Sequence, residues 1–113
     1  MAFLFLNQQK VINQLEIAES FIDRGIGLLH HSSLSIDQAM WIKPCNNIHT
    51  FFMKFDIDCV FLSKDLKVVS LFKNVRPFRV ILPQWKAHSV IEFSAGFIEK
   101  YNLKIGETLH VGD

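Results

Sequence analysis

Cys45 and His49, separated by three residues, form the pair with the clearest potential for chemistry. A thiolate beside an imidazole is the minimum for a cysteine nucleophile, and both groups also ligate zinc. A structural zinc site needs four ligands, and the possible additions, Asp58, Cys59 and His88, follow no diagnostic spacing. The pair can equally be structural, with Cys45 packed as a small hydrophobe and His49 bonded to a turn backbone. We favour the structural role over a binding or catalytic site, and either over a metal site, but all three remain open.

The distance between these two side chains depends on the turn that precedes His49. Residues four apart in a strand lie about 13 Å apart. Proline and two asparagines at positions 44–47 favour a tight turn that would shorten this distance. We therefore predict that Cys45 lies in the turn, close to His49, at the rim of a cleft that Thr50 also contacts.

Two acidic residues, Asp58 and Glu92, lie within otherwise apolar strand patterns. Strand alternation places Asp58 on one face with residues 60 and 62, opposite residues 57, 59 and 61. A carboxylate on an apolar face must be paired or hydrogen-bonded, and Arg24 is our first choice of partner for Asp58. We favour a structural role for both acids. The alternative is an acid–base or ligand-binding role in which both face one cavity.

Residues 66–91 form a basic segment with five lysines and arginines and no acid, although the net charge of the chain is only +1. Its basic residues are Lys67, Lys73, Arg76, Arg79 and Lys86. Such a segment can face an anion, or it can place solvated charges on strand edges and so discourage edge-to-edge pairing. We favour the second interpretation. Binding of nucleic acid or another polyanion, with Phe78 and Trp85 as stacking rings, is the weakest functional hypothesis because the overall charge is near zero.

The composition is typical of one cytoplasmic domain that spans residues 1–113. The length is close to that of a single domain, and half of the residues, including eleven Phe, are hydrophobic, which suffices for a core without disulfides. The two cysteines are expected to be reduced thiols. The first residues lack the basic region and apolar run of a signal peptide, and no apolar run is long enough to span a bilayer. No membrane partner is therefore expected.

Short strand patterns dominate the chain and predict a mainly β fold, a small sandwich or barrel-like domain with two short helices. The strands are expected at residues 2–6, 11–17, 39–42, 48–54, 57–62, 66–72, 75–82, 88–93 and 107–111. The helices are expected near residues 20–29 and 95–102, capped by Ser20 and Ser94. Asn102 should end the second helix in a left-handed conformation. Large apolar groups on both faces of residues 48–54 indicate a central strand packed in the core.

Four groups of residues, in the same order along the chain, carry a resemblance to a known family. The longest is residues 42–62, with Pro-Cys-Asn-Asn-Ile-His-Thr-Phe-Phe-Met at its centre. The others are Arg-Gly-Ile-Gly-Leu-Leu at 24–29, Arg-Pro-Phe-Arg at 76–79, and Val-Ile-Glu-Phe-Ser-Ala-Gly at 90–96 followed by Leu-Lys-Ile-Gly-Glu. Together they resemble the prokaryotic family called domain of unknown function 192. The resemblance implies a compact β-sandwich-like or barrel-like domain with short helices, and it implies no established activity, substrate or cofactor.

These observations favour a binding or accessory domain for a small ligand or a protein, with one polar-lined cleft. Its candidate ligand-binding residues are Arg24, Cys45, His49, Thr50, Asp58 and Glu92. The alternative is a small enzyme, such as a hydrolase, that uses Cys45 with His49. No cofactor or metal is expected, because neither a glycine-rich phosphate loop nor a Cys-x-x-Cys pair is present.

Overall fold

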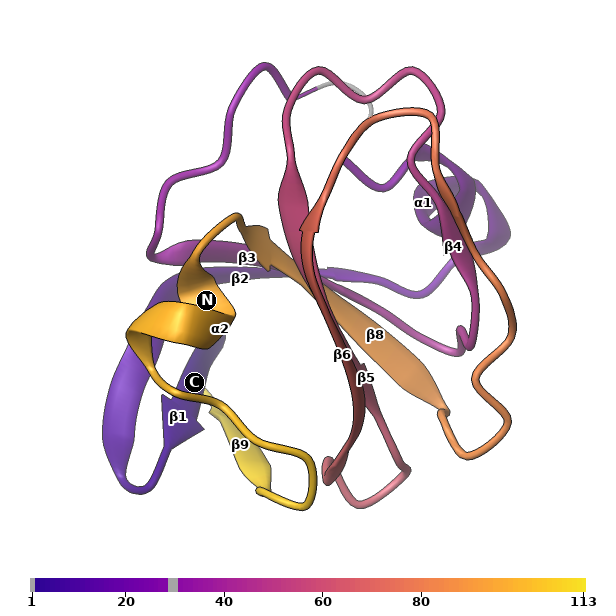
Figure 1. The fold of residues 1–113 in the computed structure, drawn as a ribbon. Coiled ribbons are helices and arrows are strands. Elements are labelled where there is room, and N and C mark those ends of the chain that lie inside the picture. The colour runs from indigo at the N-terminus through magenta and orange to yellow at the C-terminus, as the bar shows by residue number, and fades with distance from the viewer. Residues whose placement is uncertain (1, 29–30) are drawn as a thin grey trace.

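The computed structural model describes residues 2–28 and 31–113, and most of its regular structure is strand (Figure 1). The strands are β1 (Ala2–Leu6), β2 (Gln9–Ala18), β3 (Gln38–Ile42), β4 (Ile48–His49), β5 (Ile57–Leu62), β6 (Val68–Val75), β7 (Val80–Ile81), β8 (Ser89–Ser94) and β9 (Leu109–Gly112). Two short helices, α1 (Phe21–Ile26) and α2 (Phe97–Lys100), complete it. The predicted mainly β fold with two short helices is confirmed.

Seven of the strands form one curled sheet in the order β6-β5-β8-β3-β2-β1-β9. β1 and β2 form an antiparallel hairpin, and β2 runs parallel to β3 with α1 between them in the chain. The two edges of the sheet approach each other, because Lys67 and Thr108 form an isolated bridge and Leu109 N donates to Leu66 O at 2.9 Å. The sheet is therefore barrel-like, which is one of the two architectures that the sequence predicted.

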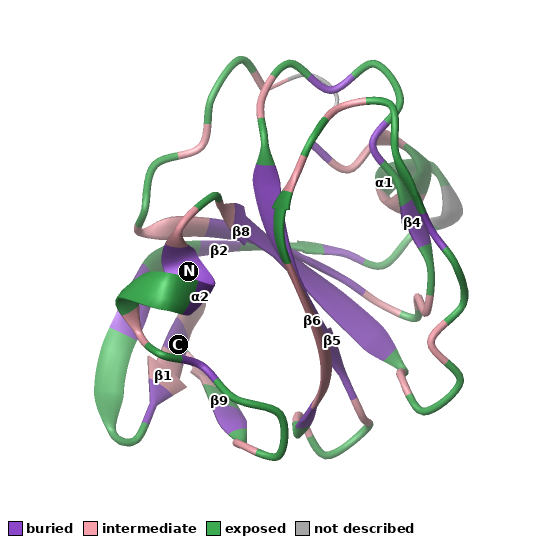
Figure 2. Ribbon diagram, in the orientation of Figure 1, coloured by how far each residue is buried: buried purple, intermediate pink, exposed green. Residues whose placement is uncertain are grey.

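The central strands β5 and β8 are buried on both faces, as Figure 2 shows by their purple colour. Inside the curl, Val60 and Leu62 of β5 join an apolar cluster that draws on β1, β2, β3, β8, β9 and α2. On the outer face, Cys59 and Phe61 join a second cluster, which is covered by the β4–β7 ribbon and by residues after α1. The alternation predicted for residues 57–62 is confirmed.

Both helices are shorter than predicted. α1 begins at the expected cap, where Ser20 Oγ accepts from Asp23 N at 3.0 Å, but it ends at Ile26 because Gly27 turns the chain with a φ of 49°. The predicted end near residue 29 lies outside the described residues. At α2 the predicted cap was wrong: Gly96, with a φ of 99°, precedes the helix and no side chain caps it. Asn102 is left-handed, as predicted.

The predicted central strand over residues 48–54 was wrong. Only Ile48 and His49 pair, with β7, and the chain then turns at Thr50. Thr50 is buried and its Oγ1 donates to Arg76 O at 2.6 Å and accepts from Arg79 N at 2.9 Å. These bonds fix the turn to the 76–79 segment, so the strand expected at 75–82 also shrinks to two residues. Consequently the predicted core packing fails at Phe52, which is 74% exposed.

Asp58 is completely buried and is bonded to two backbone amides. Its Oδ1 accepts from Asn74 N at the end of β6, and its Oδ2 accepts from Ile98 N in α2, both at 2.9 Å. The prediction of a buried, hydrogen-bonded carboxylate is confirmed. The choice of Arg24 as its partner was wrong, because Asp58 faces the inside of the curl and Arg24 lies on α1, outside it.

Replacing Asp58 with alanine should leave two buried N–H groups without acceptors, at a cost of about 1–3 kcal/mol each. We expect the free energy of unfolding of Asp58→Ala, measured by urea denaturation, to fall by about 3 kcal/mol or more. Asp56→Ala, at an exposed position two residues away, is the matched control and should change it by less than about 0.5 kcal/mol. Equal stability of the two variants would contradict the role assigned to Asp58.

Candidate functional site

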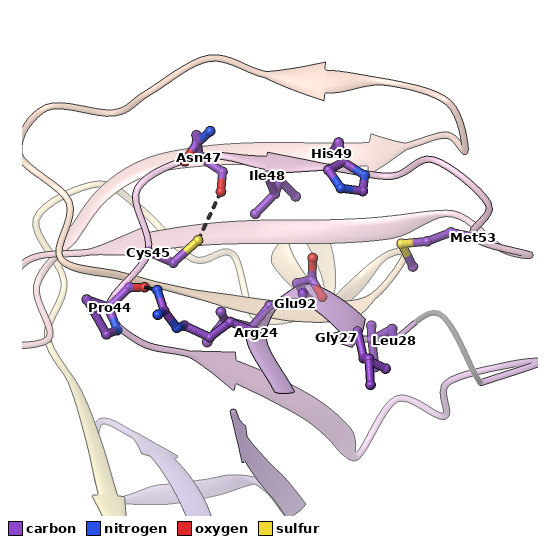
Figure 3. Close-up of a pocket in the computed structure, with 13 residues that line it drawn as sticks. Arg24, Gly27, Leu28, Pro44, Cys45, Asn47, Ile48, His49, Met53 and Glu92 are labelled. Carbon is purple, nitrogen blue, oxygen red and sulfur yellow. Dashed lines mark hydrogen bonds between the residues drawn. The ribbon is translucent and has the colours of Figure 1, made fainter. Parts of the chain in front are cut away.

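A pocket of about 130 Å³ lies on the outer face of the sheet, between α1, β4 and the β3 and β8 strands (Figure 3). Four of the sequence-predicted residues, Arg24, Cys45, His49 and Glu92, line it. The remaining lining residues are Gly25, Ile26, Gly27, Leu28, Ile42, Pro44, Asn47, Ile48 and Met53. The pocket is thus an apolar cavity into which a few polar groups project, which is the usual composition of a small-molecule site.

Glu92 is the deepest polar group of the pocket, with only 3% of its surface exposed. It lies opposite Cys59 and Met40 in the sheet register, so its side chain is directed to the outer face. No hydrogen bond or ion pair joins its carboxyl group to another of the described side chains. Burial raises the pKa of Glu92 from 4.5 to about 7. Among the described residues this buried carboxyl group has no partner, which leaves it available to a ligand.

Gly27 lies against this carboxyl group at the floor of the pocket. A Cβ at position 27 would lie 3.8 Å from Glu92 Oε1 and 3.7 Å from Ile42 Cδ1, in ordinary van der Waals contact with both. The φ of 49° at Gly27 is strained for any residue with a side chain. Glycine is therefore favoured here by its backbone conformation, which ends α1 beside the pocket.

Arg24 extends from the last turn of α1 to the opposite end of the pocket, beside the turn at Pro44. Its Nη1 donates to Pro44 O at 3.1 Å, which holds the guanidinium in place. Its Nε is buried and has no hydrogen-bond partner in the described part of the chain. Arg24 and Glu92 thus face one pocket from different elements, with opposite charges and no direct bond between them.

Cys45 lies in the turn before β4, as predicted, and its thiol donates to Asn47 O at 2.9 Å. Burial raises the pKa of the Cys45 thiol, and the backbone contact at Asn47 and the charge of Arg24, which lower it, do not offset this effect. The net shift favours the thiol over the thiolate. Cys45 therefore offers the pocket a polarisable neutral group.

His49 lies at the exposed rim of the same pocket and is fixed by a backbone contact. Its Nδ1 accepts from Phe51 N at 3.3 Å, so the neutral ring carries its proton on Nε2. Figure 3 shows the side chain of Ile48 between His49 and Cys45. The imidazole and the thiol thus share a cavity, and each makes its polar bond to the backbone.

The other two predicted ligand-binding residues are not among those that line the pocket. Asp58 lies on the opposite face of β5, so it and Glu92 do not face one cavity. The hydroxyl group of Thr50 is hydrogen-bonded to the backbone of Arg76 and Arg79 instead. The sequence analysis missed Gly27, Asn47 and Met53. The asparagine-rich turn was the available signal for Asn47. Strand spacing could not identify Met53, because residues 50–53 form a turn.

This arrangement can recognise a small molecule through one acid, one guanidinium, one imidazole and one thiol. Among the described residues no three His, Cys, Asp or Glu side chains converge in a way that could hold a metal ion. The described helices include none with the length and apolar character needed to cross a bilayer.

Comparison with known proteins gives relatives over almost the whole chain. The chain is 28% identical to the UPF0127 protein PH1112 of Pyrococcus horikoshii, over 94% of this chain and 96% of that protein. It is 33% identical to a UPF0127 protein of Thermococcus gammatolerans, over 84% of this chain and 64% of the relative. A crystal structure of a protein of unknown function from Novosphingobium aromaticivorans has the same fold, with a TM-score of 0.83 at 16% identity, covering 96% of this chain and 82% of that one.

The family described as DUF192, uncharacterized ACR, matches residues 4–111. This range includes the four sequence-predicted residues that line the pocket and all four motifs on which the resemblance was based. The chain therefore belongs to the DUF192 family.

Proposed function

We propose that the pocket binds a small polar molecule that bridges Arg24 and Glu92. The observation that carries this proposal is the buried Glu92 carboxyl group, which has no partner among the described residues and faces a cavity that Arg24 also lines. A buried acid without a hydrogen bond costs stability, so a fold that retains one gains most from a ligand that satisfies it. The complementary ligand presents an acceptor, such as a carboxylate, to Arg24 and a hydroxyl or amino donor to Glu92.

The volume of the pocket limits the ligand to a small molecule. An engineered cavity of about 150 Å³ holds one benzene molecule, which has six non-hydrogen atoms, so 130 Å³ accommodates a molecule of about that size. The apolar lining, including Leu28, Ile42 and Met53, favours a short aliphatic body between the two polar ends. Small hydroxy- and amino-carboxylates meet both conditions.

Both cysteines are free thiols, which suits a reducing compartment such as the cytoplasm.

A binding role is better supported than the hydrolase alternative. A cysteine nucleophile requires a lowered thiol pKa and a base that accepts its proton. At Cys45 the thiol pKa is raised and its proton is directed to Asn47 O. The His49 Nδ1 atom already accepts from a backbone amide.

The proposal predicts that small carboxylates bind at Glu92 and Arg24. We expect at least one of glycolate, lactate, glycine and serine to raise the melting temperature of the protein and to shift NMR signals of pocket residues. Glu92→Gln and Arg24→Gln should each weaken this binding about tenfold or more, because a charge-assisted bond is worth about 1.5–3 kcal/mol. Glu99→Gln, on the exposed surface of α2, is the control and should leave it unchanged. If none of the four binds, or if both pocket variants bind as the parent does, the proposal is wrong.

The raised pKa of Glu92 predicts how stability depends on pH. The folded state holds this proton more tightly than the unfolded chain, so the contribution of Glu92 to the free energy of unfolding is largest below pH 4.5 and is lost as the pH rises to about 7. At roughly 1.4 kcal/mol per pH unit, the decrease due to Glu92 is about 3 kcal/mol.

Glu92→Gln removes this titration. In urea denaturation from pH 4 to pH 8, we expect the variant to gain stability relative to the parent across this interval, reaching a difference of about 3 kcal/mol at its upper end. Parallel pH profiles for the two proteins would show that Glu92 is not a buried acid without a partner.

The state of Cys45 predicts slow alkylation. Because its pKa is raised and its proton is bonded to Asn47 O, iodoacetamide at pH 7.5 should modify it more slowly than a free thiol of pKa about 8.5. Cys59, which is fully buried, should react only on unfolding. Mass spectrometry of tryptic peptides gives both rates. A rate at Cys45 above that of free cysteine would restore the hydrolase alternative.

A further inference from the structure

Four aromatic side chains are exposed in the segments that flank the strands of the β4–β7 ribbon. Phe51 and Phe52 lie in the turn after β4, while Phe78 and Trp85 lie on either side of β7. Their exposed fractions are 39%, 74%, 59% and 87%. None is needed by the pocket, and the sequence analysis had expected the first two in the core.

Thr50 is the reason that two of these aromatic segments meet. Besides its side-chain bonds, Thr50 N donates to Arg79 O at 2.9 Å and its carbonyl accepts from Phe78 N at 3.0 Å. The ring of Phe78 consequently lies 5.8 Å from that of Phe52, edge-on, and 6.3 Å from that of Phe51. Phe52 and Phe78 both have a positive φ, 67° and 63°, which is rare for aromatic residues. The fold therefore holds these rings in solvent by a strained backbone.

Each of the three most exposed rings has a cation within two residues. Lys54 follows Phe52, Lys86 follows Trp85, and Arg76 and Arg79 flank Phe78; all four cations are exposed. None of the four forms an ion pair among the described residues. Asp56 is the acidic residue that lies nearest in the sequence to any of these four cations, and residues 66–91 contain no acidic residue. We call the four rings and these four cations the aromatic–basic face.

This face is elongated. Residues 79–84 run antiparallel beside residues 46–50, since Thr50 pairs with Arg79 and Gln84 N donates to Asn46 O at 2.8 Å. The seven residue steps from Phe78 to Trp85 span up to about 23 Å when extended. Figure 1 shows this segment, in orange, running along one side of the molecule from the loop after β6 toward β8. At the stacked spacing of about 3.4 Å, that length corresponds to roughly seven nucleotides.

We propose that the aromatic–basic face binds single-stranded nucleic acid. A repeated combination of ring and cation matches a polymer in which each unit offers a flat base and a phosphate. A symmetric contact with a second copy of the chain would bring like charges together, so the charge distribution disfavours that partner. The face is separate from the Arg24–Glu92 pocket, and either site can function without the other.

The test measures binding of a fluorescein-labelled 15-nucleotide oligothymidine by fluorescence anisotropy. We expect binding at 20 mM salt that weakens as salt increases. The double variant Phe78→Ser/Trp85→Ser should weaken it at least about 25-fold, since each lost stacking contact costs roughly fivefold or more. Arg76→Gln/Arg79→Gln should also make the slope of log K against log salt less steep by about 1.4.

Matched changes elsewhere on the surface are the controls. Ile105→Ser removes an exposed apolar side chain, and Lys64→Gln/Lys104→Gln removes two exposed cations. Both, together with Glu92→Gln, should bind the oligonucleotide as the parent does. The proposal is overturned if the protein does not bind the oligonucleotide at low salt, or if the control variants lose as much affinity as the face variants. It is also overturned if the ring variant binds like the parent, because binding would then depend on charge alone. Binding to phosphatidylserine vesicles but not to the oligonucleotide would assign the face to a lipid surface instead and would also overturn it.

Discussion

The burial of β5 and β8 on both faces is the constraint on which the rest of the structure depends. A strand with no solvent-facing side must satisfy every polar side chain internally, because desolvating an ionisable group without a partner is costly. β5 meets this condition at Asp58, whose two carboxyl oxygens accept hydrogen bonds from backbone amides of α2 and of the end of β6. One carboxylate thus connects a central strand, its neighbour and a helix, and it orients the elements that fill the inside of the curl.

Glu92, on the neighbouring strand and the opposite face, is buried to nearly the same degree but has no such bonds among the described residues. The difference lies in what covers each face. Inside the curl, a helix and a strand end present free backbone amides to Asp58. Outside it, the sheet is covered by apolar side chains, by the turn at Pro44 and by Gly27, which leave a cavity next to the acid. Two acids that look equivalent in the sequence therefore have different roles: one organises the fold, and the other faces a site.

The sequence could predict the strands because their alternation is local information. It identified Cys45, His49 and Glu92 because each is unusual in its own strand or turn, whereas Arg24 was chosen as a partner for Asp58 and lines the pocket for another reason. It could not predict which residues share a cavity, since that depends on how the sheet curls and which face each strand presents. Arg24 and Asp58 are the clearest case: their charges suggested a pair, but the sheet lies between them. The strand predicted at 48–54 failed because Thr50 bonds a segment more than twenty residues away, and that contact outweighs the strand propensity of the two phenylalanines.

Thr50 also determines how the pocket and the aromatic–basic face are related in space. Its bonds to Arg76 and Arg79 hold the 76–79 segment against the end of β4, and β4 continues directly into the residues that line the pocket. His49, immediately before Thr50, lines the pocket, and its ring lies 5.1 Å from that of Phe51. The pocket and the aromatic–basic face are therefore neighbours at the end of β4, and the contact between the His49 and Phe51 rings is where they meet. They are nonetheless built by different contacts, because the pocket is lined from α1, β3 and β8, whereas the 76–79 segment is held by Thr50.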